Sequence, residues 1–204
     1  MGTLPGTDRL ASALVFAEVL HRGQRRKQGP VPYLAHLLSV TGLVLYYGGT
    51  EEEAVAAALH DAVEDRGGPH TLKHIRNAFG EGVAAIVEGC SDTDGATTPK
   101  PPWRGRKEHW LTRVPGASLS VVLVAAADKL DNARDVLRGL ATEGDALWER
   151  FRVGRDEQLW YFRSLVPVFR EALARHAGDP RAPRVATLVD DLARVLREVE
   201  VAAG

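Results

Sequence analysis

The chain has 204 residues, of which 45% are hydrophobic and 26% are charged, and its formal net charge at pH 7 is −1. This balance is that of an ordinary globular protein with one sizeable core, and it gives no basic excess for nucleic acid. The single cysteine, Cys90, excludes an intrachain disulfide framework and a multi-cysteine metal site. No secretory pattern is visible in MGTLPGTDRL, and no apolar run approaches the ~20 residues that span a bilayer. We therefore expect a soluble, cytoplasmic protein.

Three helices are predicted in the first third of the chain, because apolar residues recur there at i, i+3 and i+4 while alternating strand patterns are nearly absent. Their expected bounds are about 8–21, 33–47 and 50–65. The second helix is expected to end at the glycine pair 48–49. Thr50, with Glu53 three residues later, has the pattern of a capping box at the start of the third helix.

Helical periodicity continues through the rest of the chain. Short helices are expected at about 71–79 and 81–89, followed by a polar loop over about 92–100 and a helix that ends at Arg113. Ser118 or Ser120 opens a strongly apolar helix, and two or three helices fill the remainder, the last of them amphipathic. Because there is no internal repeat and no clear break, the pattern predicts an all-α protein of one domain.

The stretch ALHDAVEDRGG carries four ionisable side chains where an apolar helix pattern ends. At about 100° per residue, they fall at roughly 0°, 100°, 40° and 140°, in one wedge of the predicted helix. These side chains belong to His60, Asp61, Glu64 and Asp65. Because a buried carboxylate is costly unless it is paired or bound to a cation, we expect a positive charge against this wedge.

Two further apolar helices each carry a polar group of ligand type. His36 lies in YLAHLLSVTGLVL, and Asp128 lies deep inside VVLVAAADKLDNARDVL. One shared divalent ion accounts for all of these anomalies together, and the mixed nitrogen and oxygen donors suit Mn²⁺, Fe²⁺ or Zn²⁺. The predicted ligands are His36, His60, Asp61 and Asp128.

Each of these residues also has an ordinary interpretation when it is taken singly. A lone core histidine such as His36 is usually only hydrogen-bonded, and Asp128 has Lys129 and Arg134 as candidate ion-pair partners. The adjacent pair His60-Asp61 favours the metal interpretation, since one short segment then supplies two ligands.

Three stretches together resemble a known enzyme family. HRGQRRKQGPVPYLAH, AAALHDAVEDRG and VAAADKLDNARDV resemble, in order, the patterns H-x-G-Q-x-R-K…P-Y-x-x-H, A-x-L-H-D-x-x-E-D-T and K-x-A-D-K-L-x-N-x-R. These are patterns of the HD superfamily of metal-dependent phosphohydrolases, and more closely of the RelA/SpoT homologues in their stand-alone form, the small alarmone hydrolases. The resemblance extends from about Ala11 to Leu137.

The resemblance implies one helical HD domain over residues 1–204, with a catalytic core at about 8–140 and C-terminal helices at about 141–204. It implies one Mn²⁺ per chain, with Fe²⁺ or Zn²⁺ as alternatives, held by the four predicted ligands. The implied reaction, part of the stringent response, removes the 3′-pyrophosphate of (p)ppGpp to give GDP or GTP and pyrophosphate. By position, Glu64 and Asp65 orient the attacking water or transfer a proton, or else only support the histidines.

A substrate with several negative charges needs a local basic surface on a nearly neutral protein. Family position favours Arg26 and Lys27, and a second basic cluster follows the polar loop, although either cluster is also compatible with a solvated face. Tyr161 and Trp103 are candidates to stack on a base, with core packing as the alternative. The predicted substrate-binding residues are Arg26, Lys27, Arg104, Lys107, Asn132 and Tyr161.

Three hypotheses for function remain at this point. The first is an alarmone pyrophosphohydrolase, and the second is an HD phosphohydrolase that acts on an adenine alarmone, a nucleoside monophosphate or NADPH. The third is a non-catalytic regulator, which has no need of the full set of ligand and acidic residues. We expect a nucleotide as the partner, with no nucleic acid and no membrane, and we leave a homo-oligomer open.

Overall fold

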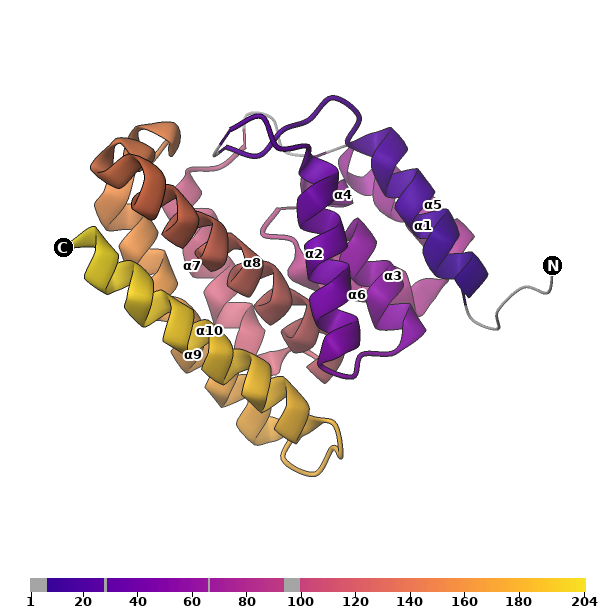
Figure 1. The fold of residues 1–204 in the computed structure, drawn as a ribbon. Coiled ribbons are helices and arrows are strands. Elements are labelled where there is room, and N and C mark those ends of the chain that lie inside the picture. The colour runs from indigo at the N-terminus through magenta and orange to yellow at the C-terminus, as the bar shows by residue number, and fades with distance from the viewer. Residues whose placement is uncertain (1–6, 28, 66, 94–99) are drawn as a thin grey trace.

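The computed structural model describes residues 7–27, 29–65, 67–93 and 100–204, and for Thr7 and Asp65 it describes the backbone alone. Within these ranges the regular structure is helical, and extended pairing is limited to an isolated bridge between Arg25 and Pro32 (Figure 1). The predicted all-α fold is therefore confirmed. The helices are α1 (Thr7–Leu20), α2 (Tyr33–Tyr46), α3 (Glu51–Leu59), α4 (Ala62–Asp65), α5 (Gly68–Phe79), α6 (Glu81–Cys90), α7 (Trp103–Arg113), α8 (Leu119–Glu143), α9 (Gly154–Arg175) and α10 (Ala182–Ala203), with 3₁₀ turns at Val114–Gly116 and Gly144–Arg150.

Two helix starts agree with the capping residues expected from the sequence. The Thr50 side chain accepts a hydrogen bond from the backbone of Glu53, and the Glu53 side chain accepts one from the backbone of Thr50, which completes the capping box. At α8 the cap is Ser118, whose hydroxyl accepts a hydrogen bond from the backbone of Val121. In both cases a side-chain oxygen satisfies an N–H group that has no partner within the helix.

Replacement of Thr50 by alanine is expected to lower the free energy of unfolding by about 1 kcal/mol, because the first turn of α3 loses its cap. Chemical denaturation of the wild type and the variant measures this difference. Thr187→Ala, at an exposed hydroxyl within α10, is the matched control and should change stability little. Equal stability of Thr50→Ala and the wild type would show that the cap contributes nothing.

The predicted continuous helix over 50–65 is wrong at one point, because the chain turns at His60 and Asp61 between α3 and α4. Nδ1 of His60 donates a hydrogen bond to the carbonyl of Ala57, at 2.8 Å. In an uninterrupted helix that carbonyl would accept from the backbone N–H of Asp61. The angles calculated for one helix therefore do not apply beyond His60, and Glu64 belongs to a separate short helix.

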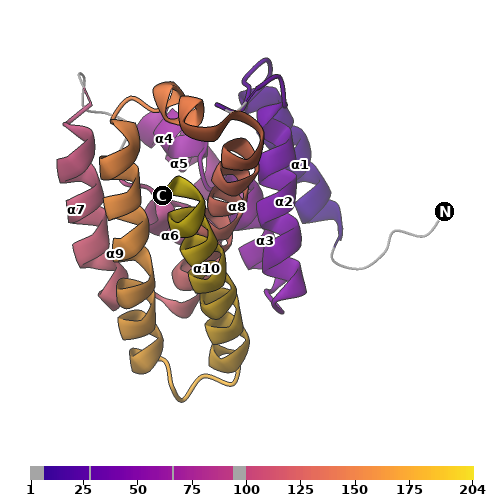
Figure 2. The ribbon, with the colours of Figure 1, turned by 60° about the vertical axis from the view of Figure 1, so that its left-hand side comes forward.

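The long helix α8 runs through the middle of the molecule and organises the core. It contacts α2, α3 and α6 on one side and α9 and α10 on the other, so one long apolar element joins the two groups of helices (Figures 1 and 2). Its segment from Val121 to Ala127 is buried throughout. None of the described helices is long and apolar enough to cross a membrane.

The polar segment between α6 and α7 carries the predicted loop. Residues 94–99 lie outside the described residues, so the expected mobile loop over 92–100 is described only at its two ends. Asp92, at the first end, is almost fully buried. Lys100, at the other end, donates a hydrogen bond to the backbone carbonyl of Glu64 at 2.8 Å.

Candidate metal centre

Three helical segments bring His36, His60 and Asp128 to one buried point. His36 comes from the inner face of α2, His60 from the end of α3 and Asp128 from the middle of α8. One nitrogen or oxygen atom from each of these residues lies within 4.8 Å of the others. Among the described residues, these three side chains form a group of possible ligands close enough together to hold a metal ion. The group contains three of the four predicted ligands.

The fourth predicted ligand, Asp61, points at the same two imidazoles. Its Oδ2 atom lies 3.0 Å from Nε2 of His60 and 3.5 Å from Nε2 of His36. Asp128 Oδ1 lies 3.3 Å from Nε2 of His36 and 3.6 Å from Nε2 of His60. Two imidazole nitrogens thus face two carboxylate oxygens at 3.0 to 3.6 Å.

The hydrogen bonds of the two imidazoles engage their Nδ1 atoms and leave their Nε2 atoms available to bind a metal ion. Nδ1 of His60 is held as the donor by the carbonyl of Ala57, and Nδ1 of His36 donates to Asp131 Oδ2 at 2.6 Å. With the proton on Nδ1, the lone pair of each ring lies on Nε2, which faces Asp61 and Asp128. Nε2 of His60 is buried without a hydrogen bond, so these residues fit a divalent cation with nitrogen and oxygen ligands.

The pKa values of these histidines and aspartates also favour a bound positive charge. Burial opposes a charge on His36, but the carboxylates of Asp128, Asp131 and Asp61 outweigh it and raise the pKa of His36 to about 9. Burial likewise opposes charge on Asp61 and Asp128, yet His60 and Lys129 beside them hold both pKa values well below 3.8. A cation must displace protons from the imidazoles, so its affinity should fall as the pH falls.

Both interpretations of Asp128 are compatible with the structure, because its two oxygens have different partners. Oδ2 lies 2.5 Å from Nζ of Lys129, which is the ion pair considered from the sequence alone. Oδ1 faces the imidazoles and accepts a hydrogen bond from the amide of Asn132 at 2.5 Å. One carboxylate thus joins the lysine to the candidate metal centre.

Asp131 is a functional candidate that the sequence reasoning missed. It occupies the position that the pattern K-x-A-D-K-L-x-N-x-R leaves open, one residue before Asn132. Its carboxylate accepts hydrogen bonds from His36 and, at 2.5 Å, from Ser39, and it lies 3.8 Å from Arg26. The available signal was the i+3 spacing from Asp128, which puts both carboxylates on one face of α8.

Replacement of Asp131 by asparagine is expected to weaken Mn²⁺ binding by about 10- to 100-fold, because His36 loses the carboxylate that orients it and raises its basicity. Titration calorimetry with Mn²⁺ measures the affinity directly. Asp190→Asn, at a surface ion pair with Arg170, is the control and should bind as the wild type does. Unchanged affinity in Asp131→Asn would contradict the role of this carboxylate.

Glu64 lies beside the candidate metal centre in a second group of charged side chains. Its Oε1 atom is 3.5 Å from Nη1 of Arg106, which also contacts the buried Asp92. Lys107, which lies on α7 next to Arg106, pairs with Asp92 at 2.7 Å. Burial, reinforced by the negative charge of Asp92, raises the pKa of Glu64. The side chain of Asp65 lies outside the described residues.

Of the predicted substrate-binding residues, Arg26 and Asn132 are bound to other side chains near the metal centre. Arg26 donates to Asp135 at 2.9 and 3.1 Å and to the Asn132 side-chain oxygen at 3.0 Å. Asn132 in turn donates to Asp128, so a chain of contacts leads from Arg26 to a predicted ligand. Lys27 is exposed, with its ammonium 5.4 Å from the ring centre of Phe151.

The other predicted substrate-binding residues divide into two groups. Lys107 lies with its ammonium 5.0 Å from the ring centre of the buried Tyr161 and close to Glu64 and Asp92, so these two residues share the region of the metal centre. Arg104 instead pairs with Glu108 and Glu157 and stacks on Trp160 at 3.3 Å. Its guanidinium already has anionic partners in this conformation.

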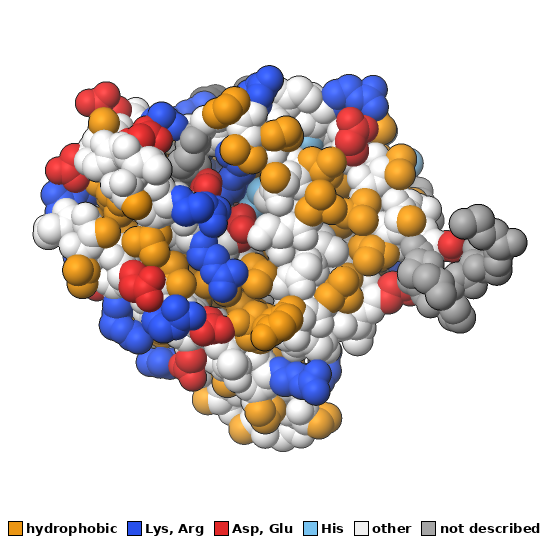
Figure 3. Space-filling model, in the orientation of Figure 1, with side chains coloured by type: hydrophobic (Ala, Val, Ile, Leu, Met, Phe, Trp, Pro, Cys, Tyr) orange, Lys and Arg blue, Asp and Glu red, His pale blue; other side chains and the backbone are white. Residues whose placement is uncertain are grey.

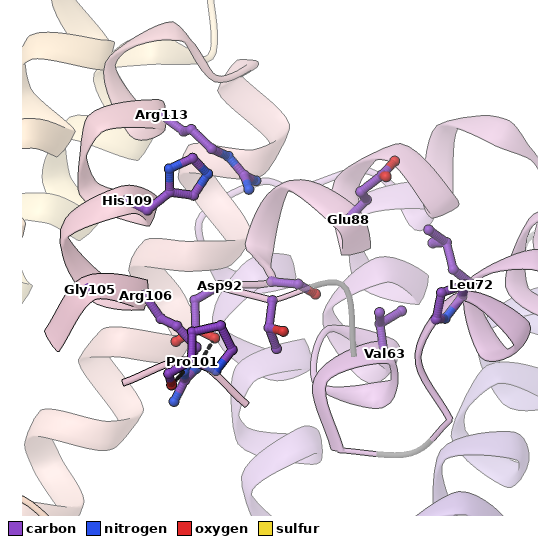
Figure 4. A pocket seen from close by; sticks show the side chains of 12 residues that line it. Val63, Leu72, Glu88, Asp92, Pro101, Gly105, Arg106, His109 and Arg113 are labelled. Atoms are coloured by element: carbon purple, nitrogen blue, oxygen red, sulfur yellow. Dashed lines mark hydrogen bonds and ion pairs between the residues drawn. The ribbon is translucent and has the colours of Figure 1, made fainter. Parts of the chain in front are cut away.

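A pocket of about 560 Å³ opens behind the contact between Arg106 and Asp92. Figure 4 shows Arg106, His109 and Arg113 along α7 on one side, with Val63 and Glu88 among the side chains across from them. None of the four predicted metal ligands lines this pocket, whereas Arg106 contacts both the pocket and Glu64. Arg106 and Asp92 thus belong both to the lining of this pocket and to the charged group that contains Glu64.

His36, His60 and Asp128 meet at one buried point between helices, which is the arrangement of helical proteins that hold a metal ion in their core. The family model described as an HD domain matches residues 13–157, which is more than half of the chain. The chain therefore belongs to the HD domain family.

Curated relatives share the same region of the chain. The guanosine-3′,5′-bis(diphosphate) 3′-pyrophosphohydrolase MESH1 of Xenopus tropicalis is 39% identical over 132 residues, which covers 63% of this chain and 70% of that protein. The human protein of the same name is 37% identical over 148 residues, covering 71% and 76%. The bifunctional (p)ppGpp synthase/hydrolase SpoT of Escherichia coli is 32% identical over 132 residues, but the match covers only 18% of its length.

Solved structures share the fold over most of the chain. A crystal structure from Listeria monocytogenes is 30% identical, has a TM-score of 0.67, and covers 84% of this chain and 99% of that one. A metazoan orthologue of SpoT, described as hydrolysing ppGpp, also has a TM-score of 0.67 and covers 95% and 97%, at 24% identity. The second similarity supports the fold alone.

Proposed function

We propose that the protein is a metal-dependent pyrophosphohydrolase that removes the 3′-pyrophosphate of (p)ppGpp, giving GDP or GTP and pyrophosphate. The observation that carries this proposal is the convergence of His36, His60 and Asp128 from three helices, with Nε2 of His60 buried and aimed at the shared space. The relatives whose names state this reaction support the choice of substrate.

The proposed metal ion is Mn²⁺, one per chain, held by His36, His60, Asp61 and Asp128, with Fe²⁺ or Zn²⁺ as alternatives. When bound, such an ion supplies a water of lowered pKa and a Lewis acid for a phosphate oxygen. The protein's part is to present the Nε2 atoms with their lone pairs free, which the hydrogen bonds from Nδ1 to Ala57 and Asp131 achieve. Tyr33 orients Asp61 by donating a hydrogen bond to its Oδ2 at 2.6 Å.

Glu64 is the proposed proton acceptor. Its raised pKa makes it a stronger base than an exposed glutamate, and Arg106 at 3.5 Å holds its carboxylate in place. Asp65, the next residue, is proposed as its catalytic partner from sequence position. Lys107 pairs with Asp92 and its charge also acts on Glu64, so a cation lies near the proposed base for a phosphate of the substrate.

The proposed substrate surface combines Arg26, Lys27 and Asn132 with Lys107, Tyr161 and Arg104. Arg26 and Asn132 approach the metal centre through Asp128, and Lys107 lies against Tyr161 on the other side. Arg104 would have to leave Glu108 and Glu157 before it could bind a phosphate, which makes it the weakest member of the set. We further propose that residues 1–204 form one domain that acts in the cytoplasm, as its single cysteine suits a reducing compartment.

Incubation of the purified protein and Mn²⁺ with a nucleotide panel tests the proposal. Pyrophosphate released from ppGpp, with GDP as the other product, is the expected result. Orthophosphate released from nucleoside monophosphates or NADPH, with ppGpp left intact, would replace this substrate by another within the same family. No product from any nucleotide, in a protein that still binds Mn²⁺, would favour a non-catalytic regulator.

A further inference from the structure

An exposed apolar face covers α1 and α2 on the side away from the metal centre's ligands. Among the described residues, seven large hydrophobic side chains are exposed, and six of them lie on or next to these two helices. Figure 3 shows hydrophobic side chains gathered over α1 and α2, while many Lys and Arg side chains lie in the middle and left of the view. The six are Val15, Val19, Val31, Leu38, Leu45 and Tyr46.

The outer face of α2 carries no charge at all. Between Lys27 and Glu51 the sequence contains no Lys, Arg, Asp or Glu, so the solvent side of this surface helix lacks the groups that normally cover one. Apolar surface of this extent on a soluble protein marks an interaction site. Because the outer side of α2 is uncharged, the surface that packs against α2 should also be apolar and uncharged.

We propose that this face binds a second copy of the same chain, in a dimer with a two-fold axis. Outside α1, α2 and the loop before α2, the described surface exposes one large hydrophobic side chain, Val201. The face that matches the apolar surface of α1 and α2 in another copy is therefore that same surface. A patch that pairs with itself is the arrangement of a two-fold dimer.

The spacing of large and small residues on α2 suits such pairing. The exposed positions 35, 38, 42 and 45 follow the 3-4 spacing of helix pairs, and they alternate between small and large side chains as Ala35, Leu38, Gly42 and Leu45. A Cβ atom added at Gly42 would meet nothing within 4 Å, so the glycine leaves an open space on the surface. The leucines of one copy fit the spaces at Ala35 and Gly42 of the other.

The charges at the two ends of the face select the antiparallel arrangement. Asp8 lies at the start of α1, two turns before Val15 on the same side of the helix, and Arg25 lies in the loop before α2. These two residues are exposed, and neither makes an ion pair within the described chain; Arg25 only donates to the carbonyl of Pro30. Figure 1 places the start of α1 and this loop at opposite ends of the face, so a two-fold axis brings the acidic end of one copy to the basic end of the other.

Sedimentation equilibrium of the full chain over a range of concentrations tests the proposal. The wild type is expected to form a dimer, and Leu38→Glu and Leu45→Glu are each expected to weaken it at least tenfold, since every substitution occurs twice in the interface. Val201→Glu, at the exposed hydrophobic residue of α10, is the matched control and should dimerise as the wild type does. A wild type that stays monomeric, or a dimer that tolerates both leucine substitutions, overturns the proposal.

A charge exchange tests the arrangement separately. Asp8→Arg and Arg25→Glu should each weaken the dimer, and the double variant should restore it, because opposite charges again face each other. Failure of the double variant to recover the dimer would overturn the antiparallel arrangement. Circular dichroism confirms that each variant is folded, and the substituted side chains are exposed, so the core is unaffected.

Discussion

Replacement of Asp61 by alanine should remove the bound metal and the hydrolase activity together. Asp61 Oδ2 faces both imidazoles at 3.0 and 3.5 Å, and it is one of the two carboxylates in the pocket. Loss of a residue that only supports a metal ligand costs ~10- to 100-fold in metal affinity, so loss of a ligand should exceed this range. Metal content after dialysis and release of pyrophosphate from ppGpp are the two measurements.

The controls for this substitution separate metal loss from unfolding. Asp61→Asn keeps the size of the side chain, and circular dichroism with a thermal melt checks the fold of both variants. Asp156→Ala, at an exposed carboxylate in the first turn of α9, should retain metal and activity. Full activity in a folded Asp61→Ala variant would refute the assignment of the metal centre.

Replacement of Glu64 by glutamine should lower kcat by about 10²- to 10⁴-fold while the Mn²⁺ content stays that of the wild type, because Glu64 is the proposed proton acceptor and not a ligand. Single-turnover measurements on ppGpp give the rate, and metal analysis gives the content. A variant that stays within a few-fold of the wild-type rate would assign the proton transfer to another group, with Asp65 the next candidate.

The pH dependence of the rate gives a second measure of the role of Glu64. Burial and the charge of Asp92 raise the pKa of Glu64 above its ordinary 4.5. A proton acceptor works in its deprotonated form, so the rate should fall as the pH falls through this raised pKa, above the range of an exposed glutamate. Glu64→Gln should lose this acidic limb, while Asp131→Asn should keep it at saturating Mn²⁺.

Local patterns in the sequence alone predicted the helices and pointed to side chains that converge at the candidate metal centre. Apolar spacing placed the starts of α2 and α6 and the caps of α3 and α8 because a helix start is specified by a few adjacent residues. His36, His60-Asp61 and Asp128 were recognisable because a polar group in an apolar helix has few stable alternatives to a shared partner. The break between α3 and α4 was not predicted; at this break the imidazole of His60 donates a hydrogen bond to the backbone carbonyl of Ala57.

Only the tertiary structure decided which side chains meet around the metal centre. Asp131 and His36 are 95 positions apart, and Arg26 and Asp135 are 109 apart, so no local pattern announces either contact. Arg104 looked like a phosphate ligand in the sequence, but the packing of α7 on α9 places it against Glu157 and Trp160. The physical reason is that hydrogen bonds within a helix follow from neighbouring residues, whereas contacts between helices follow from which faces the buried core turns toward each other.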